Sequence, residues 1–365
     1  MPRLATPRVR VPPGSVAVAD GYTGIYPAEL PGGWHLIGRV AARMFDPDGS
    51  PPSLLRPGDR VVFQPVEELA FAPVESNEKN PLYVADAVAR VVDPGPWTSV
   101  QGRPCFGLGS MGVHRGGAMD LAALAAANVA LGNAPLAAAL EITVAGPDLE
   151  LLAPARLAVA GEIECMPAGA WPRSLGTGDW LKFGPVRGGT RAYLAIDGGF
   201  AEMPAAIGSR KLRRGDLLGR ARSAPGHRRI PPPTPGRVRD PTVVRAIPGP
   251  HLGWFSAAGI DTFFNAEYVV SPRSDRRGSR LEGPRVALAR PADLPPEGVT
   301  PGAVQVPGDG MPIALGPDGP VTGGYPRIAT VIGADLPLLA QARPGQRIRF
   351  ERASLADALA AWRTR

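Results

Sequence analysis

Short runs of alternating apolar and polar residues recur along the chain, and turns that contain Gly or Pro separate them. Such alternation is typical of half-buried β-strands, because successive side chains of a strand point to opposite faces of the sheet. The clearest examples are the stretches 140–152, 156–163 and 190–199. Two further stretches, 60–63 and 347–350, each follow an Arg-Pro-Gly turn. The pattern predicts a fold that is mainly β with a few helices.

Two segments carry apolar residues at helical spacing instead. Residues 119–133 are rich in Ala and Leu, and Asp120 stands at the position of an N-cap, where its carboxylate would accept backbone hydrogen bonds. Residues 353–365 form a second candidate helix with Ser354 as its N-cap. The larger apolar side chains of this helix fall on one stripe, which consists of Leu355, Leu359 and Trp362.

One sequence pattern occurs twice, near the two ends of the chain. Residues 14–40 align with residues 302–331, and the matched segments contain the cassettes PGGWHLIGRV and TGGYPRIATV. The match continues in residues 54–63 and 339–350, which share the Arg-Pro-Gly turn and the strand that follows it. The distance between the copies is far too long for a solenoid repeat. We therefore expect two or three related β-barrel-like domains made of short strands.

Shifts in composition divide the chain into successive parts. Residues 67–83 are acidic and Asn-rich with weak periodicity, which indicates a linker, and residues 223–242 are rich in Pro and Arg, which indicates a semi-rigid connector. A length of 365 residues also favours two or three domains. The predicted parts are a partial N-terminal domain at 1–66, the linker at 67–83, a middle half at 84–222, the connector at 223–242, a C-terminal half at 243–352 and a terminal helix at 353–365.

The net charge of +7 results from 40 Lys and Arg against 33 Asp and Glu. Arg residues are spread through every segment and are dense only within residues 210–229. This stretch is either a solvated basic loop or a patch for phosphate or an acidic partner. No helix-turn-helix, zinc-finger or aromatic-basic RNA motif accompanies it, so we do not expect nucleic acid as a partner.

Nothing in the sequence indicates export or a membrane span. The chain starts at Met1 without an apolar run, and no segment reaches the roughly 18 apolar residues that a membrane span needs. The two cysteines, Cys105 and Cys165, have neither metal-ligand spacing nor the pattern of a disulfide framework. These features predict a cytoplasmic protein without a membrane partner.

Common cofactor motifs are missing or stand in the wrong context. GLGSMG (107–112) fits G-x-G-x-x-G, but it follows no apolar strand and opens no helix, so we expect a Gly-rich connector. The sequence contains no P-loop and no G-x-S-x-G elbow. The four histidines have no metal-ligand spacing. One of them, His114, precedes the first helix and is either a surface residue or a substrate contact.

Charged residues beside glycines mark a more specific candidate. The stretch SPRSDRRGSRLEGP (271–284) contains Asp275, Arg276 and Glu282. It is either a hairpin held by ion pairs or a loop that binds an anion through forked Arg donors. Glu141 is a single carboxylate in an apolar run, and if it is buried it must be paired or have a raised pKa. The later Gly-Gly-Tyr-Pro element is either a tight turn or a place where backbone N–H groups approach a ligand.

Several of these motifs together identify a known family. Residues 84–352 resemble the C subunit of bacterial ATP-dependent 5-oxoprolinase, which is also known as allophanate hydrolase subunit 2, as KipA and as a biotin-dependent carboxyltransferase half. Residues 1–66 resemble the tail of the partner B subunit, which is KipI-like. The matching motifs are GGAMD, LEIT, RAYLAIDGG, SDRRGSRLEGP, GAVQVP and TGGYPRIATVIGADLPLLAQ in the first region, and PRLATPRVRVPPGSV, TGIYP, PGGWHLIGR and LLRPGDRVVF in the second.

The resemblance implies tandem cyclophilin-like β-barrel domains with a cleft between them, which accounts for the doubled cassette. It also implies the B/C component of an ATP-dependent lactam or amide hydrolase, first of all 5-oxoprolinase, which converts 5-oxo-L-proline, ATP and water to L-glutamate, ADP and phosphate. The alternatives are the carboxyltransferase half of a urea carboxylase or allophanate pathway enzyme and a Kip-type regulatory binding protein without catalysis. The cofactor would be ATP with Mg in the first case and a carboxybiotin carrier in the second.

Partners follow from the same resemblance. They are an A-type subunit of 5-oxoprolinase and the front half of a B subunit, which another polypeptide supplies or which has been lost, in an oligomer that acts on a small molecule. The sequence departs from the family pattern at 101–103, where QGR replaces Gln-Asp-x-Gly-Arg, and after GSR, where a Gly-rich segment is missing. Arg327 also replaces a common Lys, and these two side chains are not equivalent at a defined site.

The motif matches imply two groups of site residues. The catalytic candidates are carboxylates that could position water, namely Glu141, Asp275 and Glu282. The substrate-binding candidates offer cationic, amide, hydroxyl or backbone groups, and they are Arg103, Asp120, Arg276, Gln305, Thr322, Gly323, Gly324, Tyr325 and Arg327. No metal-binding set is expected.

Overall fold

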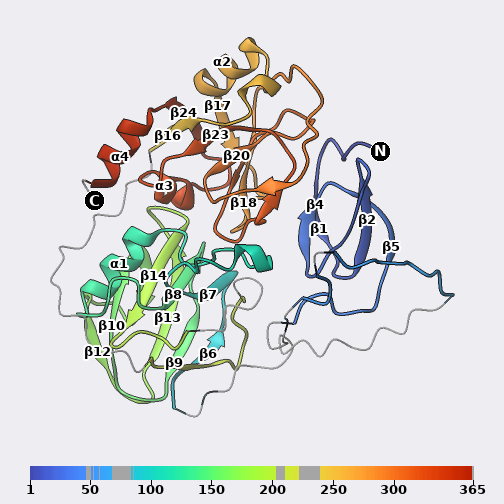
Figure 1. The fold of residues 1–365 in the computed structure, drawn as a ribbon. Helices are drawn as coiled ribbons and strands as arrows, with labels where there is room; N and C mark the ends of the chain where they lie inside the picture. Colours follow the sequence, from blue (N-terminus) through green and yellow to red (C-terminus); the bar gives the residue numbers. More distant parts are fainter. Residues whose placement is uncertain are drawn as a thin grey trace.

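The structure is a computed structural model of the chain, and it describes residues 1–46, 51, 53–56, 58–67, 84, 86–202, 210–221 and 239–363. Figure 1 shows three bodies, coloured blue, green and orange to red, which we call the N-lobe (1–67), the middle half (86–221) and the C-terminal barrel (242–352). The expected linker and connector lie mostly outside the described residues, because positions 68–83 and 223–238 are not described.

The middle half consists of two five-stranded sheets with the orders β12-β10-β14-β8-β7 and β11-β13-β9-β6-β15. Leucines from both sheets share one core, and helix α1 (Leu121–Val129) covers the other face of the first sheet. Strand β14 (Arg191–Ile196) is therefore buried along its whole length. The other strands are β6 Ala87–Asp93, β7 Trp97–Gln101, β8 Ala139–Thr143, β9 Asp148–Leu151, β10 Ala155–Ala160, β11 Ile163–Met166, β12 Arg173–Leu175, β13 Trp180–Val186 and β15 Leu217–Gly219.

The C-terminal half is a closed barrel with the strand order β16-β23-β20-β21-β18-β17-β24. Helix α2 (Ala257–Asn265) packs against β24 (Arg347–Arg352), and the rings of Phe263 and Phe350 stack with their centroids 4.5 Å apart. Helix α3 (Leu336–Gln341) leads into β24 and faces the middle half. The other strands are β16 Thr242–Pro248, β17 Glu267–Val270, β18 Gly278–Glu282, β19 Glu297–Gly298, β20 Ala303–Gln305, β21 Ile313–Leu315, β22 Thr322–Gly323 and β23 Arg327–Val331.

The N-lobe contains a three-stranded sheet with the order β3-β2-β5 and a pair, β1 with β4. Its sheet repeats part of the barrel, because β2 and β5 pair in the same register as β20 and β23, with an irregularity at the same place. The equivalent pairs are Ser15↔Arg39 and Ala303↔Thr330, Val16↔Gly38 and Val304↔Ala329, and Ala17↔Leu36 and Gln305↔Arg327. The strands are β1 Arg8–Val11, β2 Ser15–Ala19, β3 Tyr22–Ile25, β4 Leu30–Gly32 and β5 His35–Arg39.

These observations confirm a mainly β protein with few helices. Asp120 caps α1, since its carboxylate accepts hydrogen bonds from the backbone N–H groups of residues 122 and 123. Helix α4 (Leu355–Arg363) follows Ser354, whose hydroxyl accepts a hydrogen bond from Asp357 N at 3.1 Å. This helix packs through its alanines, so the apolar stripe predicted for it lies on the surface. No helix in the described part of the chain is long and apolar enough to cross a membrane.

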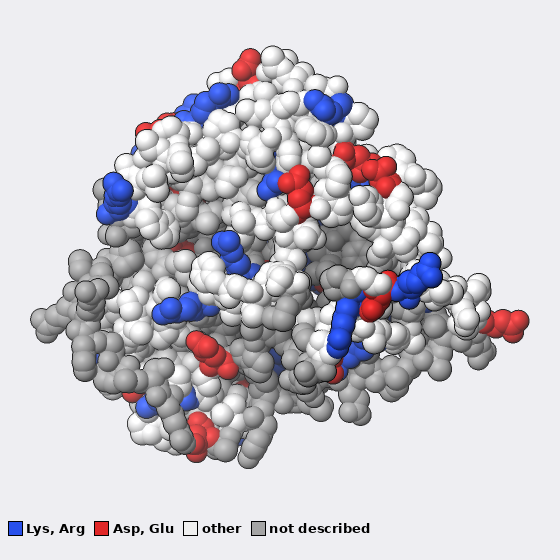
Figure 2. Space-filling view, viewed as in Figure 1, with Lys and Arg blue, Asp and Glu red and all other residues white. Residues whose placement is uncertain are grey.

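Charges of both signs are dispersed over the face of the molecule shown in Figure 2. Part of the Arg-rich stretch is described, and there Arg210 forms two hydrogen bonds with the buried carboxylate of Asp216, at 2.8 and 3.1 Å. Positions 222–229 of the stretch lie outside the described residues. In the described part of the stretch, Arg210 therefore forms a structural ion pair with Asp216.

Candidate functional site

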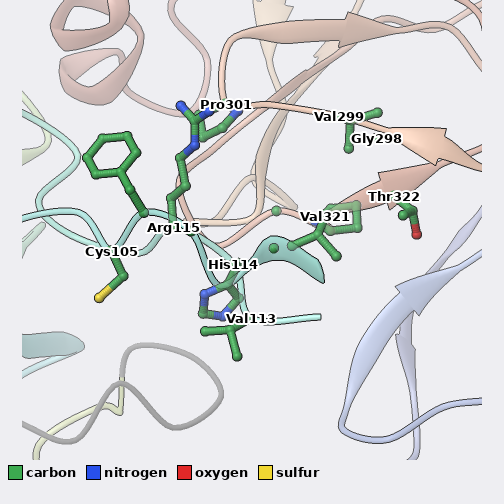
Figure 3. A pocket seen from close by; sticks show the side chains of 14 residues that line it. Cys105, Val113, His114, Arg115, Gly298, Val299, Pro301, Val321 and Thr322 are labelled. Atoms are coloured by element: carbon green, nitrogen blue, oxygen red, sulfur yellow. The ribbon is translucent and has the colours of Figure 1, made fainter. Parts of the chain in front are cut away.

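A cavity of about 360 Å³ lies between the middle half and the C-terminal barrel (Figure 3). One wall belongs to the loop 105–115, which includes the Gly-rich GLGSMG segment and a short 3-10 turn. The other wall comes from barrel residues 298–301 and 319–322. Most of the lining is apolar or glycine, and its polar side chains are those of Cys105, His114, Arg115 and Thr322.

Three of these polar side chains can form specific contacts with a small molecule. The guanidinium of Arg115 lies 5.2 Å from the ring centroid of Phe106 and, in Figure 3, extends toward Pro301. His114 Nδ1 is buried without a hydrogen-bond partner. Thr322 adds a hydroxyl group on the barrel side. Arg can form a forked pair with a carboxylate, and an imidazole nitrogen can donate or accept a hydrogen bond. The cavity therefore offers one cationic group and two hydrogen-bonding groups to a small molecule.

Arg276 connects residues that adjoin the two walls of this cavity. Its guanidinium donates to both carboxylate oxygens of Asp318, at 2.7 and 2.9 Å, and to the backbone oxygen of Gly117 at 2.7 Å. Gly116 N in turn donates to Pro317 O at 3.0 Å. Because Asp318 and Gly117 adjoin the cavity loops of the two halves, the position of Arg276 sets how far apart these loops lie.

The same guanidinium contacts Glu141, which is completely buried. Arg276 Nη1 donates to Glu141 Oε1 at 2.5 Å, and Glu141 Oε2 accepts from Tyr193 Oη at 2.7 Å and from Met119 N at 2.8 Å. Burial disfavours the charge on Arg276, but Glu141 and Asp318 outweigh it and raise the pKa of Arg276. Burial together with Glu141 raises the pKa of Tyr193 well above its usual value. This arrangement pairs Glu141 with Arg276 and keeps it away from solvent.

Asp120 makes a second connection between the halves. One carboxylate oxygen caps α1, and the other accepts a hydrogen bond from Gln341 Nε2 at 2.9 Å. The amide oxygen of Gln341 accepts from the backbone N–H groups of Thr190 and Arg191, at 3.1 and 2.9 Å. Arg191 also donates to the backbone oxygen of Ala340. Asp120 is thus placed as a cap and a structural contact, outside the lining of the cavity.

The N-lobe docks on the barrel through the two copies of the repeated cassette. The guanidinium of Arg3 lies 5.7 Å from the ring centroids of both Trp34 and Tyr325, and Arg3 Nε is 3.4 Å from Asp293. The backbone of Gly33 lies directly against the hydroxyl of Tyr325, so a Cβ at this position would clash with it. Burial raises the pKa of Tyr325. The Gly-Gly-aromatic elements of the two copies therefore form one interface around Arg3.

The other predicted residues are distributed around these features. Gln305 is buried against Gly323, and Arg327 donates to Glu297 at 2.7 Å and to Gly298 O at 3.1 Å, next to the cavity wall. The backbone of Gly324 contacts the guanidinium of Arg3.

Of the predicted residues, Thr322 lines the cavity, and three others lie apart from both the cavity and the contacts described above. Arg103 is exposed. Asp275 accepts from Arg277 N at 2.8 Å within a turn. Glu282 accepts from Ser271 Oγ at 2.6 Å and lines a second cavity of about 40 Å³. The predicted residues therefore do not converge on one point.

The sequence does not mark every residue of the site. Arg115 and Phe106 line the cavity and Asp318 holds Arg276, but none of the three belongs to a motif that predicts a site. The sequence leaves both a surface role and a substrate role open for His114. A usable signal existed in GVHRGG, where two side chains that can bind ligands stand between residues that fit tight loops.

Comparisons with known proteins match two regions of the chain to known families. Residues 111–352 match the family described as carboxyltransferase domain, subdomain A and B, and residues 1–55 match carboxyltransferase domain, subdomain C and D. The chain is 34% identical to the C subunit of 5-oxoprolinase from Haemophilus influenzae over 293 residues, which is 73% of this chain and 92% of that protein. It is 52% identical to the B subunit of 5-oxoprolinase from Escherichia coli O157:H7 over 67 residues, which is 18% of this chain and 31% of that protein.

Solved structures show the same relationship. The crystal structure of TTHA0988 superposes with a TM-score of 0.78 at 34% identity, and the match covers 96% of this chain and 73% of that chain. The urea carboxylase of Kluyveromyces lactis superposes with a TM-score of 0.67 at 29% identity, and the match covers 76% of this chain and 28% of that chain. The chain therefore belongs to the carboxyltransferase domain family, with a body similar to the 5-oxoprolinase C subunit and a shorter N-lobe similar to part of the B subunit.

Proposed function

We propose that this chain is the B/C component of an ATP-dependent lactam hydrolase that opens 5-oxo-L-proline to L-glutamate. The observation that carries the proposal is the docking of an N-lobe similar to the B subunit on a body similar to the C subunit, within one chain. Covalent linkage gives the two parts a high effective concentration, which favours a shared function.

The cavity between the halves is the proposed substrate site. Its volume of about 360 Å³ suits a five-membered lactam with room for water. We assign Arg115 to the substrate carboxylate through a forked pair. His114 is assigned to the lactam amide, because its buried Nδ1 needs a partner. Arg276 and Glu141 act beneath the site as positioning residues that hold the two walls together.

The residues of the cavity do not fit Mg·ATP. Mg²⁺ prefers carboxylate and other oxygen ligands in octahedral geometry, and the lining contains no Asp or Glu among the described residues. The described part of the chain also contains no group of three or more His, Cys, Asp or Glu side chains placed for a metal ion. We therefore assign only the organic substrate to this cavity and the nucleotide to another subunit of the complex.

A carboxyltransferase half is the second candidate function. It is favoured by the likeness to the urea carboxylase of K. lactis, which covers 76% of this chain. In this case the same cavity would accept a small amide, and the carboxyl group would come from a carboxybiotin carrier domain on another polypeptide.

The two functions are separated by their substrates. The full chain is purified together with an A-type subunit and a B-type subunit, supplied with ATP and 5-oxo-L-proline, and glutamate is measured. In parallel, the chain is supplied with a biotin carboxylase, a biotinylated carrier, urea, ATP and labelled bicarbonate, and labelled allophanate is measured. Glutamate formation that depends on this chain supports the first function. Labelled allophanate without glutamate supports the carboxyltransferase function and contradicts the lactam hydrolase. If the subunits bind but neither product forms, both proposed functions are wrong.

The site assignment has its own control. Arg115→Ala should lower glutamate formation strongly, whereas Arg187→Ala should leave it unchanged, because Arg187 is an exposed arginine that pairs with Glu164 away from the cavity. Equal activity of the two variants in an active complex would place the substrate elsewhere.

A further inference from the structure

A two-stranded ribbon forms part of the barrel wall of the cavity. It consists of residues 297–299 and 321–323, where β19 pairs with β22 and Val299 N donates to Val321 O at 2.9 Å. Both strands contribute to the cavity lining, and Figure 3 shows the contributing residues, which are Gly298, Val299, Val321 and Thr322. The position of this ribbon therefore sets the shape of the wall.

Glu297 connects the ribbon to the body of the barrel. Its Oε2 accepts a hydrogen bond from Arg327 Nη2 at 2.7 Å, and its Oε1 lies 2.9 Å from His251 Nε2. Arg327 also donates through Nη1 to the backbone oxygen of Gly298 at 3.1 Å. Both carboxylate oxygens thus have partners, which come from β23 and from the residue before the short 3-10 helix η2 (Leu252–Trp254). We call Glu297, Arg327 and His251 the latch.

The backbone of Arg327 fixes which ring nitrogen of His251 carries hydrogen. Arg327 N donates to His251 Nδ1 at 3.1 Å, so Nδ1 is the accepting nitrogen. In a neutral imidazole the other nitrogen then carries the hydrogen, and Nε2–H faces Glu297. The side chain of His251 is 11% exposed and that of Glu297 is 44% exposed, so protons reach the latch from the Glu297 side. The neutral ring satisfies both of its neighbours at once.

Protonation of the ring removes this fit. A protonated imidazole carries hydrogen on both nitrogens, and an Nδ1–H would face the N–H of Arg327. Arg290 adds a third charge, since its guanidinium lies 4.2 Å from the ring centroid of Trp254, which packs at 73° against His251. Glu297 attracts the protonated ring, whereas Arg327 and Arg290 repel it. The ring therefore leaves Arg327 N and stays with Glu297.

The barrel beneath the ribbon opposes the closed position. Gln305 is 5% exposed, and its Nε2 has no hydrogen-bond partner among the described residues. Gly323 of the ribbon lies directly over this nitrogen, because a Cβ at Gly323 would stand 2.3 Å from it. An unpaired buried donor is unfavourable, and water could hydrogen-bond to it if the ribbon moved outward. The latch therefore holds the ribbon down against this effect.

We propose that His251 is a positioning residue, which holds the ribbon against the barrel while its ring is neutral and releases the ribbon on protonation. Histidine side chains in general gain their proton between about pH 8 and pH 5, so the cavity should lose its ordered barrel wall over this range. The inference rests on the proposed function only for the identity of the bound molecule, 5-oxo-L-proline. The movement of the ribbon does not depend on that function.

The movement is tested by hydrogen exchange of the full chain without ligands at pH 8 and at pH 5.5, with each rate divided by the intrinsic rate at that pH. The amides of Val299 and Arg327 report the ribbon and the latch, because their acceptors are Val321 O and His251 Nδ1. Residues 348–350 of β24 report the barrel as a whole. From pH 8 to pH 5.5 we expect protection at Val299 and Arg327 to fall at least about 10-fold and that of β24 to change less than about 3-fold.

Two His→Gln substitutions form a matched pair. His251→Gln keeps a donor for Glu297 but cannot be protonated, so the change of protection with pH should fall below about 3-fold. His35 lies in the N-lobe, where its Nε2 is 2.8 Å from Pro2 O, and His35→Gln should keep the full change of about 10-fold or more. The β24 amides show in each variant that the barrel is folded.

Three exchange results would overturn the proposal. They are ribbon protection that does not change with pH, an equal fall in the original chain and in His251→Gln, and an equal fall in the ribbon and in β24. In the active complex, KM for 5-oxo-L-proline should rise on acidification at least about 5-fold more in the original chain than in His251→Gln, with the same change of kcat in both. The exchange measurement needs neither ATP nor substrate. A complex that forms no glutamate therefore contradicts the proposed function alone, and an active complex whose ribbon ignores pH contradicts this inference alone.

Discussion

Replacement of Arg276 by Ala is the most direct test of how the two halves are held together. The guanidinium makes five hydrogen bonds, to Glu141, Gln101, the backbone of Gly117 and both oxygens of Asp318. Arg276→Ala removes all of them and leaves Glu141, which is 0% exposed, without its closest cation. Removal of one partner of a buried ion pair costs about 3–5 kcal/mol, because the remaining charge stays desolvated. We expect a loss of stability in this range.

The loss should be measured by urea unfolding at pH 7, followed by far-UV circular dichroism and by tryptophan fluorescence. Because Arg276 connects the middle half to the barrel, the variant should also unfold in more separate steps than the original chain. Arg276→Lys keeps the charge but not the fork, so its loss should be smaller than that of Ala.

Arg347→Ala is the matched control for this prediction. Arg347 pairs with Asp240 and Glu267 at 3.2 and 3.1 Å, but the side chains of all three residues are more than two-fifths exposed. Exposed pairs contribute about 0–1 kcal/mol. If Arg276→Ala loses no more stability than Arg347→Ala, the buried network does not hold the halves together and the reasoning is wrong.

Four further predictions concern single side chains. The hydroxyl of Tyr268 is buried without a hydrogen-bond partner, so Tyr268→Phe should leave stability at pH 7 unchanged or raise it by about 1 kcal/mol in urea unfolding. Burial raises the pKa of Tyr268 to about 12 from 10.0. The contribution of this shift to folding stability is present below pH 10 and is lost as the pH rises toward 12. The Tyr268→Phe variant should therefore lose less stability than the original chain between pH 10 and pH 12. Arg115→Ala should raise KM for 5-oxo-L-proline at least about 10-fold with less effect on kcat, and a change in kcat alone would contradict its role in binding. Gly33→Ala should displace the N-lobe, because its Cβ would meet Tyr325, and hydrogen exchange at the amides of residues 322–325 should become faster. Burial raises the pKa of Cys165 against the opposing effect of Arg173, so iodoacetamide should alkylate this thiol at pH 8 more slowly than free cysteine, as mass spectrometry can show.

The sequence alone determined the features that depend on a few neighbouring residues. Asp120 could be recognised as a helix cap, and the Arg-Pro-Gly turns could be recognised as equivalent, because caps and turns require particular residues at fixed local positions. The repeated cassette also predicted that the two ends of the chain are related, and β2–β5 and β20–β23 share their register. These patterns identified the class of fold and the family.

Only the tertiary structure decided which partners the charged candidates have. Glu141 and Arg276 are 135 positions apart and Asp120 and Gln341 are 221 apart, so no local pattern could show that they pair. The cavity is likewise formed by loops from two different halves. Which distant residues a side chain pairs with depends on which surfaces pack together and on which charges the packed surfaces exclude from water. Both are properties of the folded chain. In the structure Glu141, a catalytic candidate from the sequence, and Asp120, a substrate-binding candidate, each form a hydrogen bond with a residue of the C-terminal half.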